Sequence, residues 1–578
     1  MDVVYQRRRA ANLFAVRRRL PFSGDIAMPY NKGSVAFRNR SVSADRFAMV
    51  PRADIPRSMF VSDFTHKTTF DADYLIPIYV DEVLPGDTYQ VRATMFARLN
   101  TPLYPIMDNI HIDSFFFFVP CRLVWENWQR FMGERDPNPN SSINYVVPKL
   151  DSFVGATTGS IYDYFGLPHA TFFTTATSGV NALPFRAYNL IYNEWFRDEN
   201  LINSVPFDNG NGPDDLSDYV LRKRGKRHDY FTSCLPWPQK GDSVQLPLGS
   251  MAPVRGIGTL TGDHPLTNQS VLETDSPGSN PVIYPFSQAS SVASNYLFRG
   301  QGDPGEPAIY ADLSSATAAT INEIRQAFQI QRLLERDARG GTRYTEIIRS
   351  HFGVLSPDAR LQRPEYLGGG KSIVNINPVA QTSAQFDYDS GEDPTATSPL
   401  GTLGAVGTSV AQHGFSQSFT EHGYIIGLCS VRGDLTYQQG MHKMWTRSTR
   451  FDFYWPVFAH LGEQVVRSYE IYADGSVGDL AVFGYQERWA EYRYRPSRIT
   501  GLFRSGITGT LDAWHVSQFF GTRPTLGQTF IENDTPMERI LAAGDQAANQ
   551  QFLFDSVWSV RTTRPMPAYS VPGMIDRF

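Results

Sequence analysis

The stretch TYQVRATMFARL, Thr88–Leu99, decides the fold class of this 578-residue chain. Polar Gln90, Arg92 and Arg98 lie on one side of an extended chain, and every second residue between them is apolar. A period of two is typical of a β-strand with one buried face. Pro85–Asp87, just before it, is a turn signal. The predicted buried face holds Tyr89, Val91, Ala93, Met95, Ala97 and Leu99.

The next strand along the chain is apolar on both sides. His111–Val119 contains four consecutive phenylalanines, which predicts a strand buried on both faces, and Pro120 ends the run. Strand-type composition returns later in Gly423–Tyr437, Phe451–Phe458 and Gln551–Thr563. Two stretches rich in Gly, Ser and Thr, 241–312 and 380–415, are predicted to be loops.

Helical periods are few. They predict helices over Leu123–Met132, Tyr188–Glu199, Ile321–Arg339 and Tyr344–Phe352. For the third helix we expect one stripe to pack on the body of the protein and three arginines to face a neighbour or acidic groups. The stripe is Ile321, Ile324, Phe328 and Leu334, and the arginines are Arg332, Arg336 and Arg339.

Strands at both ends, with helices and long loops between them, predict a mainly β fold. The best candidate is a two-sheet jelly roll, a β-barrel with long insertion loops and a few short helices. We divide the chain into a basic N-terminal arm, 1–59, and a single jelly-roll domain, 60–578. That domain carries inserted helical and loop regions at 123–240 and 313–375, and a surface excursion at 241–312.

Charge is concentrated at the N-terminus. Residues 1–60 hold 12 basic and 4 acidic side chains, although the whole chain has a net charge of −5. A basic arm on an acidic body is typical of a tether for a polyanion. The alternatives are a solvated, partly disordered tail and a mitochondrial transit peptide. A second basic run, Arg222–Arg227, is predicted to be a surface loop. The predicted nucleic-acid contacts are Arg7, Arg8, Arg9, Arg17, Arg18, Arg19, Arg38 and Arg40.

Motifs for chemistry are missing from the sequence. There is no P-loop, and Gly368–Ser372 is interpreted as a flexible turn. His422 and His442 lack the further ligands that zinc needs, and the three cysteines form no CxxC pair. Asp452 is interpreted as an outward acid on a strand, and Cys429 as a small buried residue. We therefore expect no enzymatic activity, no cofactor and no metal. We find no secretory signal and no apolar run long enough for a membrane span.

Three long sequence segments resemble a known protein family, and this resemblance does not follow from amino-acid composition. They are DSFFFFVPCRLVW at Asp113–Trp125, FQIQRLLERDARGGTRYTE at Phe328–Glu346 and EHGYIIGLCSVR at Glu421–Arg432. In these the chain resembles the major capsid protein of the gokushovirus branch (Gokushovirinae) of the Microviridae, which are small tailless bacteriophages with circular single-stranded DNA. The resemblance runs from about Val50 to the C-terminus and is weakest in the arm and in 241–312.

The resemblance implies an eight-stranded viral jelly roll whose copies form pentamers and close into a T=1 icosahedral shell of sixty copies around the DNA. It also implies a location in the virion capsid, and in the host cytoplasm during assembly. The implied partners are a small basic DNA-binding phage protein, other virion proteins and the host cell surface. Members of this branch carry an insertion that forms a protrusion at each threefold axis, and 241–312 is the matching candidate. We predict threefold contacts between subunits at Val282, Ile283, Tyr284 and Phe286.

A second class of function stays open at this point. A jelly-roll carbohydrate-binding or carbohydrate-active protein would also place Trp and Asp residues on strands. Size-exclusion chromatography separates the two hypotheses, because a capsid subunit forms pentamers or shells whereas such an enzyme or lectin acts as a monomer.

Overall fold

A computed structural model of the chain describes residues 56–569 with internal gaps. Between 254 and 311, and over 385–398, the structure describes strand positions but no side chains. The gaps are 135–143, 174, 176–178, 242–243, 245–253, 256, 262–270, 274–281, 285–294, 300–309, 312–320, 342–343, 354–361, 384, 388–394 and 399.

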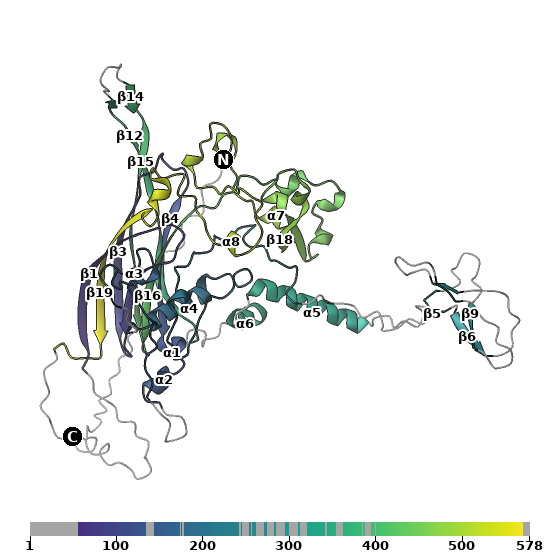
Figure 1. The fold of residues 1–578 in the computed structure, drawn as a ribbon, viewed down its shortest axis with the longest axis horizontal. Helices are drawn as coiled ribbons and strands as arrows, with labels where there is room; N and C mark the ends of the chain where they lie inside the picture. Colours follow the sequence, from purple (N-terminus) through teal and green to yellow (C-terminus); the bar gives the residue numbers. More distant parts are fainter. Residues whose placement is uncertain are drawn as a thin grey trace, which may run out of the picture. The chain divides into compact units, whose positions relative to one another are not determined.

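Two antiparallel sheets form the body of the domain (Figure 1). The five-stranded sheet has the order β1 (Ser58–Phe70), β19 (Phe552–Arg564), β3 (Thr88–Leu99), β15 (Leu403–Ser418) and β12 (Asn375–Ala380). The four-stranded sheet has the order β11 (Glu365–Ile373), β4 (Ile110–Pro120), β16 (Gly423–Gly433) and β2 (Ile76–Val83).

The chain winds between these sheets in jelly-roll fashion. β1, β2, β3 and β4 alternate between the five-stranded and the four-stranded sheet, and β15, β16 and β19 do the same at the other end of the chain. β11 passes through Val374 directly into β12 and so crosses from one sheet to the other. This arrangement confirms the predicted mainly β, jelly-roll fold class.

The core between the sheets follows the alternation in the sequence. All six residues of the predicted apolar face of β3 are buried, and their polar neighbours are exposed. Trp558 of β19 is fully buried, stacks on Tyr79 with ring centroids 4.9 Å apart and meets Phe116 edge-on at 6.0 Å. Aromatic rings packed in this way fix the distance between the two sheets.

A second core covers the outer face of the four-stranded sheet, which explains why β4 is apolar on both sides. It is formed by the insertion that follows β4. The predicted helix over 123–132 is wrong in detail, because extended backbone at Trp125 divides it into two short helices. The predicted helix over 188–199 begins earlier, at Leu183, and continues as a π-turn over Tyr192–Phe196. The helices here are α1 (Cys121–Val124), α2 (Trp128–Phe131), α3 (Ile161–Tyr164) and α4 (Leu183–Ile191).

Two predicted loops are strands. The segment 380–415 is predicted to be a loop, yet β15 runs for 16 residues beside β3. Close approach requires two of its glycines, since a Cβ on Gly414 would lie 2.1 Å from the carbonyl oxygen of Val91 and one on Gly407 would lie 2.8 Å from the Cβ of Leu99. Gly368–Ser372 is likewise not a turn but part of β11, where the register against β4 shifts at a bulge. Gly and Ser therefore mark tight packing here, not flexibility.

The remaining elements are short, apart from one long helix. α5 (Ile321–Gly340) and α6 (Tyr344–Phe352) confirm the predicted helices, and Gly353 ends the second with φ of +69°. The described parts of 241–312 are short antiparallel pairs. These pairs are β5 (Val254–Arg255) with β10 (Tyr310–Ala311), β6 (Ile257–Thr261) with β9 (Asn295–Arg299), and β7 (Val271–Glu273) with β8 (Val282–Tyr284). Later in the chain β13 (Gln385–Asp387) pairs with β14 (Thr395–Ser398), and β17 (Glu463–Arg467) pairs with β18 (Val482–Glu487). The short helices α7 (Ala490–Arg493) and α8 (Gln528–Ile531) follow.

Candidate functional site

Both sets of site residues predicted from sequence lie where the structure describes no side chains. Val282, Ile283 and Tyr284 form β8, paired with β7, and Phe286 lies outside the described residues. The structure therefore tests neither prediction. The arginines that also lie outside the described residues are Arg7, Arg8, Arg9, Arg17, Arg18, Arg19, Arg38 and Arg40.

Helix α5 is anchored to the body by its last turns. Arg339 forms ion pairs with Glu463 and, at 3.3 Å, with Glu487, which confirms the expectation that it faces acidic groups. The predicted packing of Phe328 is wrong, because its ring is 66% exposed. Ile330 and Leu333 are exposed as well. Ile324 and Leu334 of the predicted stripe are half-buried, so the stripe packs on the body only in part.

An exposed array of rings follows β16. Phe451–Phe458, predicted as a strand, forms two 3₁₀ turns, Arg450–Asp452 and Pro456–Phe458. Asp452 is not an outward acid on a strand. Its carboxylate accepts hydrogen bonds from the N–H groups of Thr449 (2.7 Å) and Ser448 (3.0 Å), which lower the pKa of Asp452 to about 2. The exposed rings, called here the aromatic surface, are Trp445, Phe451, Phe453, Tyr454, Trp455, Tyr492 and Tyr494.

Arginines lie among these rings. The Arg447 guanidinium stands 4.3 Å from the ring centre of Tyr492, and Arg450 stands 5.6 Å from that of Trp455. Soluble monomers rarely expose so many large apolar side chains together, and such arrays mark interaction sites. Aromatic residues and arginine are also the residues enriched in protein interfaces.

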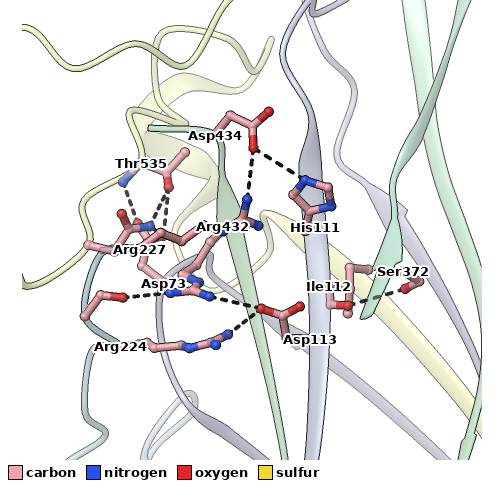
Figure 2. A network of polar contacts seen from close by, with 12 residues as sticks. Asp73, His111, Ile112, Asp113, Arg224, Arg227, Ser372, Arg432, Asp434 and Thr535 are labelled. Atoms are coloured by element: carbon pink, nitrogen blue, oxygen red, sulfur yellow. Dashed lines mark hydrogen bonds and ion pairs between the residues drawn. The ribbon is translucent and has the colours of Figure 1, made fainter. Parts of the chain in front are cut away.

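The basic run Arg222–Arg227 is not the surface loop predicted from sequence. Arg224 is half-buried, and its guanidinium bonds Asp113 on β4 at 2.6 Å. Arg432 on β16 reaches the same carboxylate at 3.2 Å and donates to the carbonyl of Gly225 at 2.9 Å (Figure 2). Burial favours a raised pKa for Asp113, but the two guanidinium charges outweigh it and lower the pKa overall. A carboxylate in an apolar strand thus fixes the loop to the sheet.

A second carboxylate continues the network. Asp434 accepts from Arg227 at 3.0 Å and lies 3.4 Å from Nε2 of His111 (Figure 2). Burial, followed by the charge of Arg227, lowers the pKa of His111, so the ring is neutral at pH 7. On the far side of the loop, the N–H of Arg224 donates to the carbonyl of Asp73 at 2.7 Å, and the Asp73 carboxylate accepts from both the N–H and the hydroxyl of Thr535. The loop is therefore held on both sides by buried polar contacts.

A cleft of about 630 Å³ opens beside this network. It is lined by rings from β4, β11 and the π-turn on one side and by the segment 224–228 on the other. Sequence reasoning missed this region because the contact between Asp113 and Arg224 spans 111 residues. The available signal was the single carboxylate inside an otherwise apolar strand, since a buried charge needs a partner.

Within the described ranges, no group of three or more His, Cys, Asp and Glu side chains could hold a metal ion. His422 packs edge-on against Trp128, and Nδ1 of His442 accepts from the N–H of Met444. The three cysteines are free and buried, as predicted for Cys429. No helix in the described part of the chain is long and apolar enough to cross a membrane.

Comparison with known proteins gives one consistent result. Residues 48–574 match the family model described as capsid protein (F protein). The chain is 47% identical to capsid protein VP1 of Bdellovibrio phage phiMH2K over 542 residues, which cover 92% of this chain and 98% of the relative. It is 43% identical to capsid protein VP1 of Chlamydia phage 1, with the same shares covered. It is 35% identical to capsid protein VP1 of Spiroplasma virus 4, over 91% of this chain and 97% of the relative.

Proposed function

This chain belongs to the capsid protein (F protein) family, and from that premise we propose that its copies associate as pentamers and close into a T=1 icosahedral shell around circular single-stranded DNA. The resemblance to gokushovirus capsid proteins is confirmed by the relatives. The chain is a structural, non-enzymatic protein of a bacteriophage capsid, and its copies associate with one another.

The aromatic surface is the observation in the structure that supports association of several copies of this chain. Trp445 is 70% exposed and Phe451 is 57% exposed. Burial of such rings contributes about 25 cal/mol per Å² of apolar area removed from water, which is the usual driving force for association. A second copy of this chain in the same pentamer is therefore the proposed occupant of the aromatic surface.

The arm is proposed to contact the packaged DNA. It carries 12 basic side chains in the first 60 residues and enters the domain at β1. Each neutralised phosphate releases counterions, so replacement of Arg7–Arg9 and Arg17–Arg19 by Ser is expected to weaken DNA retention and to flatten its salt dependence. The described core between the two sheets begins at Phe70, and we expect the jelly roll of this variant to stay folded. Unchanged salt sensitivity contradicts this part of the proposal.

The excursion 241–312 is proposed to form a protrusion at each threefold axis and to meet the host cell surface. Two-stranded pairs such as β7 with β8 are marginal alone and need neighbours. Three copies would supply these neighbours, with Val282, Ile283, Tyr284 and Phe286 between chains. Deletion of 250–300 is expected to leave pentamers intact and to reduce attachment to host cells or stability at the threefold contact. Full infectivity of the deletion variant contradicts this role.

Light scattering coupled to size-exclusion chromatography tests the assembly proposal. A pentamer of the 65.0 kDa chain has a mass of about 325 kDa. Replacement of Trp445 and Phe451 by Ser is expected to yield folded monomers. The matched control replaces Phe96 and Val410, which are exposed on the outer face of β3 and β15, and is expected to keep the pentamer. A monomer of the parent chain that binds glycans would support the carbohydrate-binding alternative instead.

A further inference from the structure

One wall of the cleft beside Asp113 is aromatic. Phe115 and Phe117 of β4 pack against Phe196 with centroids 5.3 and 5.8 Å apart. Two rings keep accessible surface at the mouth of the cleft, Trp195 at 38% and Tyr366 at 44%. Their centroids are 6.1 Å apart, and the indole N–H of Trp195 donates to the carbonyl of Pro364 at 2.9 Å, which fixes the ring. The guanidinium of Arg363 lies 4.4 Å from the ring centre of Trp195 and covers part of that ring. A flat, apolar group entering the cleft therefore meets the remaining exposed surface of rings that are already positioned.

The opposite wall has an excess of positive charge. Three arginines, Arg224, Arg227 and Arg432, share the two carboxylates of Asp113 and Asp434, so one guanidinium charge has no counter-charge within the network (Figure 2). Lys226, Arg197 and the exposed His228 also line the cleft, together with one carboxylate, that of Asp198. The basic side chains of the lining still outnumber the acidic ones.

Two hydrogen-bond donors in this wall have no partner among the described residues. Arg432 is only 8% exposed, yet no described residue accepts from its Nε. The same holds for Nη2 of Arg227. Burial, followed by the charge of Arg224, lowers the pKa of Arg432 to about 10, which agrees with an uncompensated positive potential. Because these two atoms are themselves buried, an anion in the cleft would be held by the positive charge of the two guanidinium groups and by the accessible part of Arg227.

We propose that this cleft binds a nucleotide of single-stranded nucleic acid, with the phosphate against Arg227 and Arg432 and the base stacked on Trp195 and Tyr366. The volume of about 630 Å³ lies within the range of about 300–1,000 Å³ typical of small-molecule sites. The proposal rests on the proposed function in one respect, namely that the nucleic acid is the packaged DNA.

The chemistry favours unpaired nucleotides over the acidic segment of a protein. A carboxylate would use only the cationic wall and leave the rings exposed, whereas a nucleotide uses both walls. Cations beside stacking platforms are the usual means of binding unpaired strands, and they give little sequence preference because every base has a π-face. We therefore expect binding of any unpaired sequence and no preference for one base.

Photocrosslinking of the full-length chain tests this site separately from the basic arm. The probe is an eight-nucleotide thymidine oligomer that carries 5-iododeoxyuridine, which crosslinks to aromatic side chains. Trypsin releases the peptide Ala187–Arg197, AYNLIYNEWFR, which contains Trp195 and Phe196. We expect this peptide to carry the label. Trp195→Leu and Arg227→Gln are each expected to lower its labelling about tenfold at fixed probe concentration, the size of one lost base–aromatic stack.

Matched variants outside the cleft are the controls. Phe172→Leu removes a ring that is 82% exposed and does not line the cleft, and Arg98→Gln removes one positive charge from the outer face of β3. Both are expected to leave labelling of 187–197 unchanged. A loss as large as that of the cleft variants would show diffuse electrostatic binding and overturn the proposal. Competition by an oligoglutamate as strong as that by unlabelled oligothymidine would assign the cleft to an acidic protein segment instead.

The outcome distinguishes this inference from the proposed function. Label on the arm alone, in a protein that forms shells, overturns the cleft and leaves the capsid proposal intact. Label on 187–197 in a protein that forms neither pentamers nor shells supports the cleft and contradicts the proposed assembly.

Discussion

Replacement of Asp113 by Asn is expected to destabilise the unassembled subunit strongly. The carboxylate is almost fully buried and bonds Arg224 at 2.6 Å and Arg432 at 3.2 Å. The amide that replaces it is neutral, so two guanidinium groups lose their shared counter-charge. Loss of one partner of a buried ion pair costs about 3–5 kcal/mol, because the other charge stays buried and uncompensated.

Two contacts reduce this cost. The guanidinium of Arg224 also lies 4.7 Å from the ring centre of Phe115, and Arg432 keeps its hydrogen bond to the carbonyl of Gly225. We therefore expect a value near the lower end of the range, about 3 kcal/mol. The matched control is Asp555→Asn, which breaks the ion pair with Lys67 at 3.2 Å between two largely exposed side chains. Such exposed pairs contribute less than about 1 kcal/mol.

Urea unfolding at one fixed protein concentration, followed by tryptophan fluorescence, measures both variants. The pH dependence has a definite sign. The pKa of Asp113 is lower in the folded than in the unfolded protein. Its contribution is therefore complete above the unfolded pKa of about 3.9 and is lost as the pH falls through the lower, folded pKa. The difference between parent and Asp113→Asn should be constant above pH 5 and shrink below pH 4. Equal costs for Asp113→Asn and Asp555→Asn would refute the reasoning.

Three further predictions concern the stability of the same subunit. Trp558→Ala should lower the free energy of unfolding by about 3–5 kcal/mol, because the ring is fully buried between the sheets. In the same urea assay Phe328→Ala, on the exposed face of α5, should lower it by less than about 1 kcal/mol. Gly369→Ala should lower the midpoint of thermal unfolding, since its Cβ would lie 2.1 Å from the carbonyl oxygen of Ser114, and Gly521→Ala, with open space around it, should leave the midpoint unchanged. Burial lowers the pKa of Lys226 to about 8, below its unfolded value of about 10.4, so the charged side chain destabilises the folded subunit at pH 7 and this effect fades between pH 8 and 10. Lys226→Met should therefore be more stable than the parent at pH 7, and the difference between the two chains should shrink over that range. A difference that does not change with pH contradicts the last prediction.

Strands with a strong pattern were predictable from sequence, and strands built from small residues were not. β3, β4 and β19 could be predicted because their apolar residues alternate or run continuously, as burial on one or two faces requires. β15 carries the same alternation, but its inward positions are filled by Gly407, Ser409 and Ala411 beside closely packed neighbours. Composition alone does not distinguish a strand of small, closely packed residues from a loop, because both are rich in Gly and Ser.

The prediction for the aromatic run Phe451–Phe458 was wrong in the opposite sense, because a strand was predicted where there is none. Its composition is typical of a strand, yet the rings are exposed on two 3₁₀ turns. Sequence patterns report that a residue avoids water but not which surface covers it. The proposed function assigns the cover of the aromatic surface to another copy of the chain. Phe328 is a second exposed ring that the sequence pattern alone placed against the body. The cleft was not predictable either, because it joins residues of β4, β11, β16 and the segment 224–228 that meet only in the folded chain.

Electron cryomicroscopy of particles that contain this chain tests the central claim most directly. The account predicts one jelly roll in each asymmetric unit of an icosahedral shell, sixty copies in all, with about 3.9 MDa of this 65.0 kDa chain in each particle. It also predicts that the aromatic surface is buried against a neighbouring copy and that residues 241–312 converge at the threefold axes. A shell with several copies in each asymmetric unit, or one that leaves Trp445 and Phe451 exposed to solvent, would contradict it.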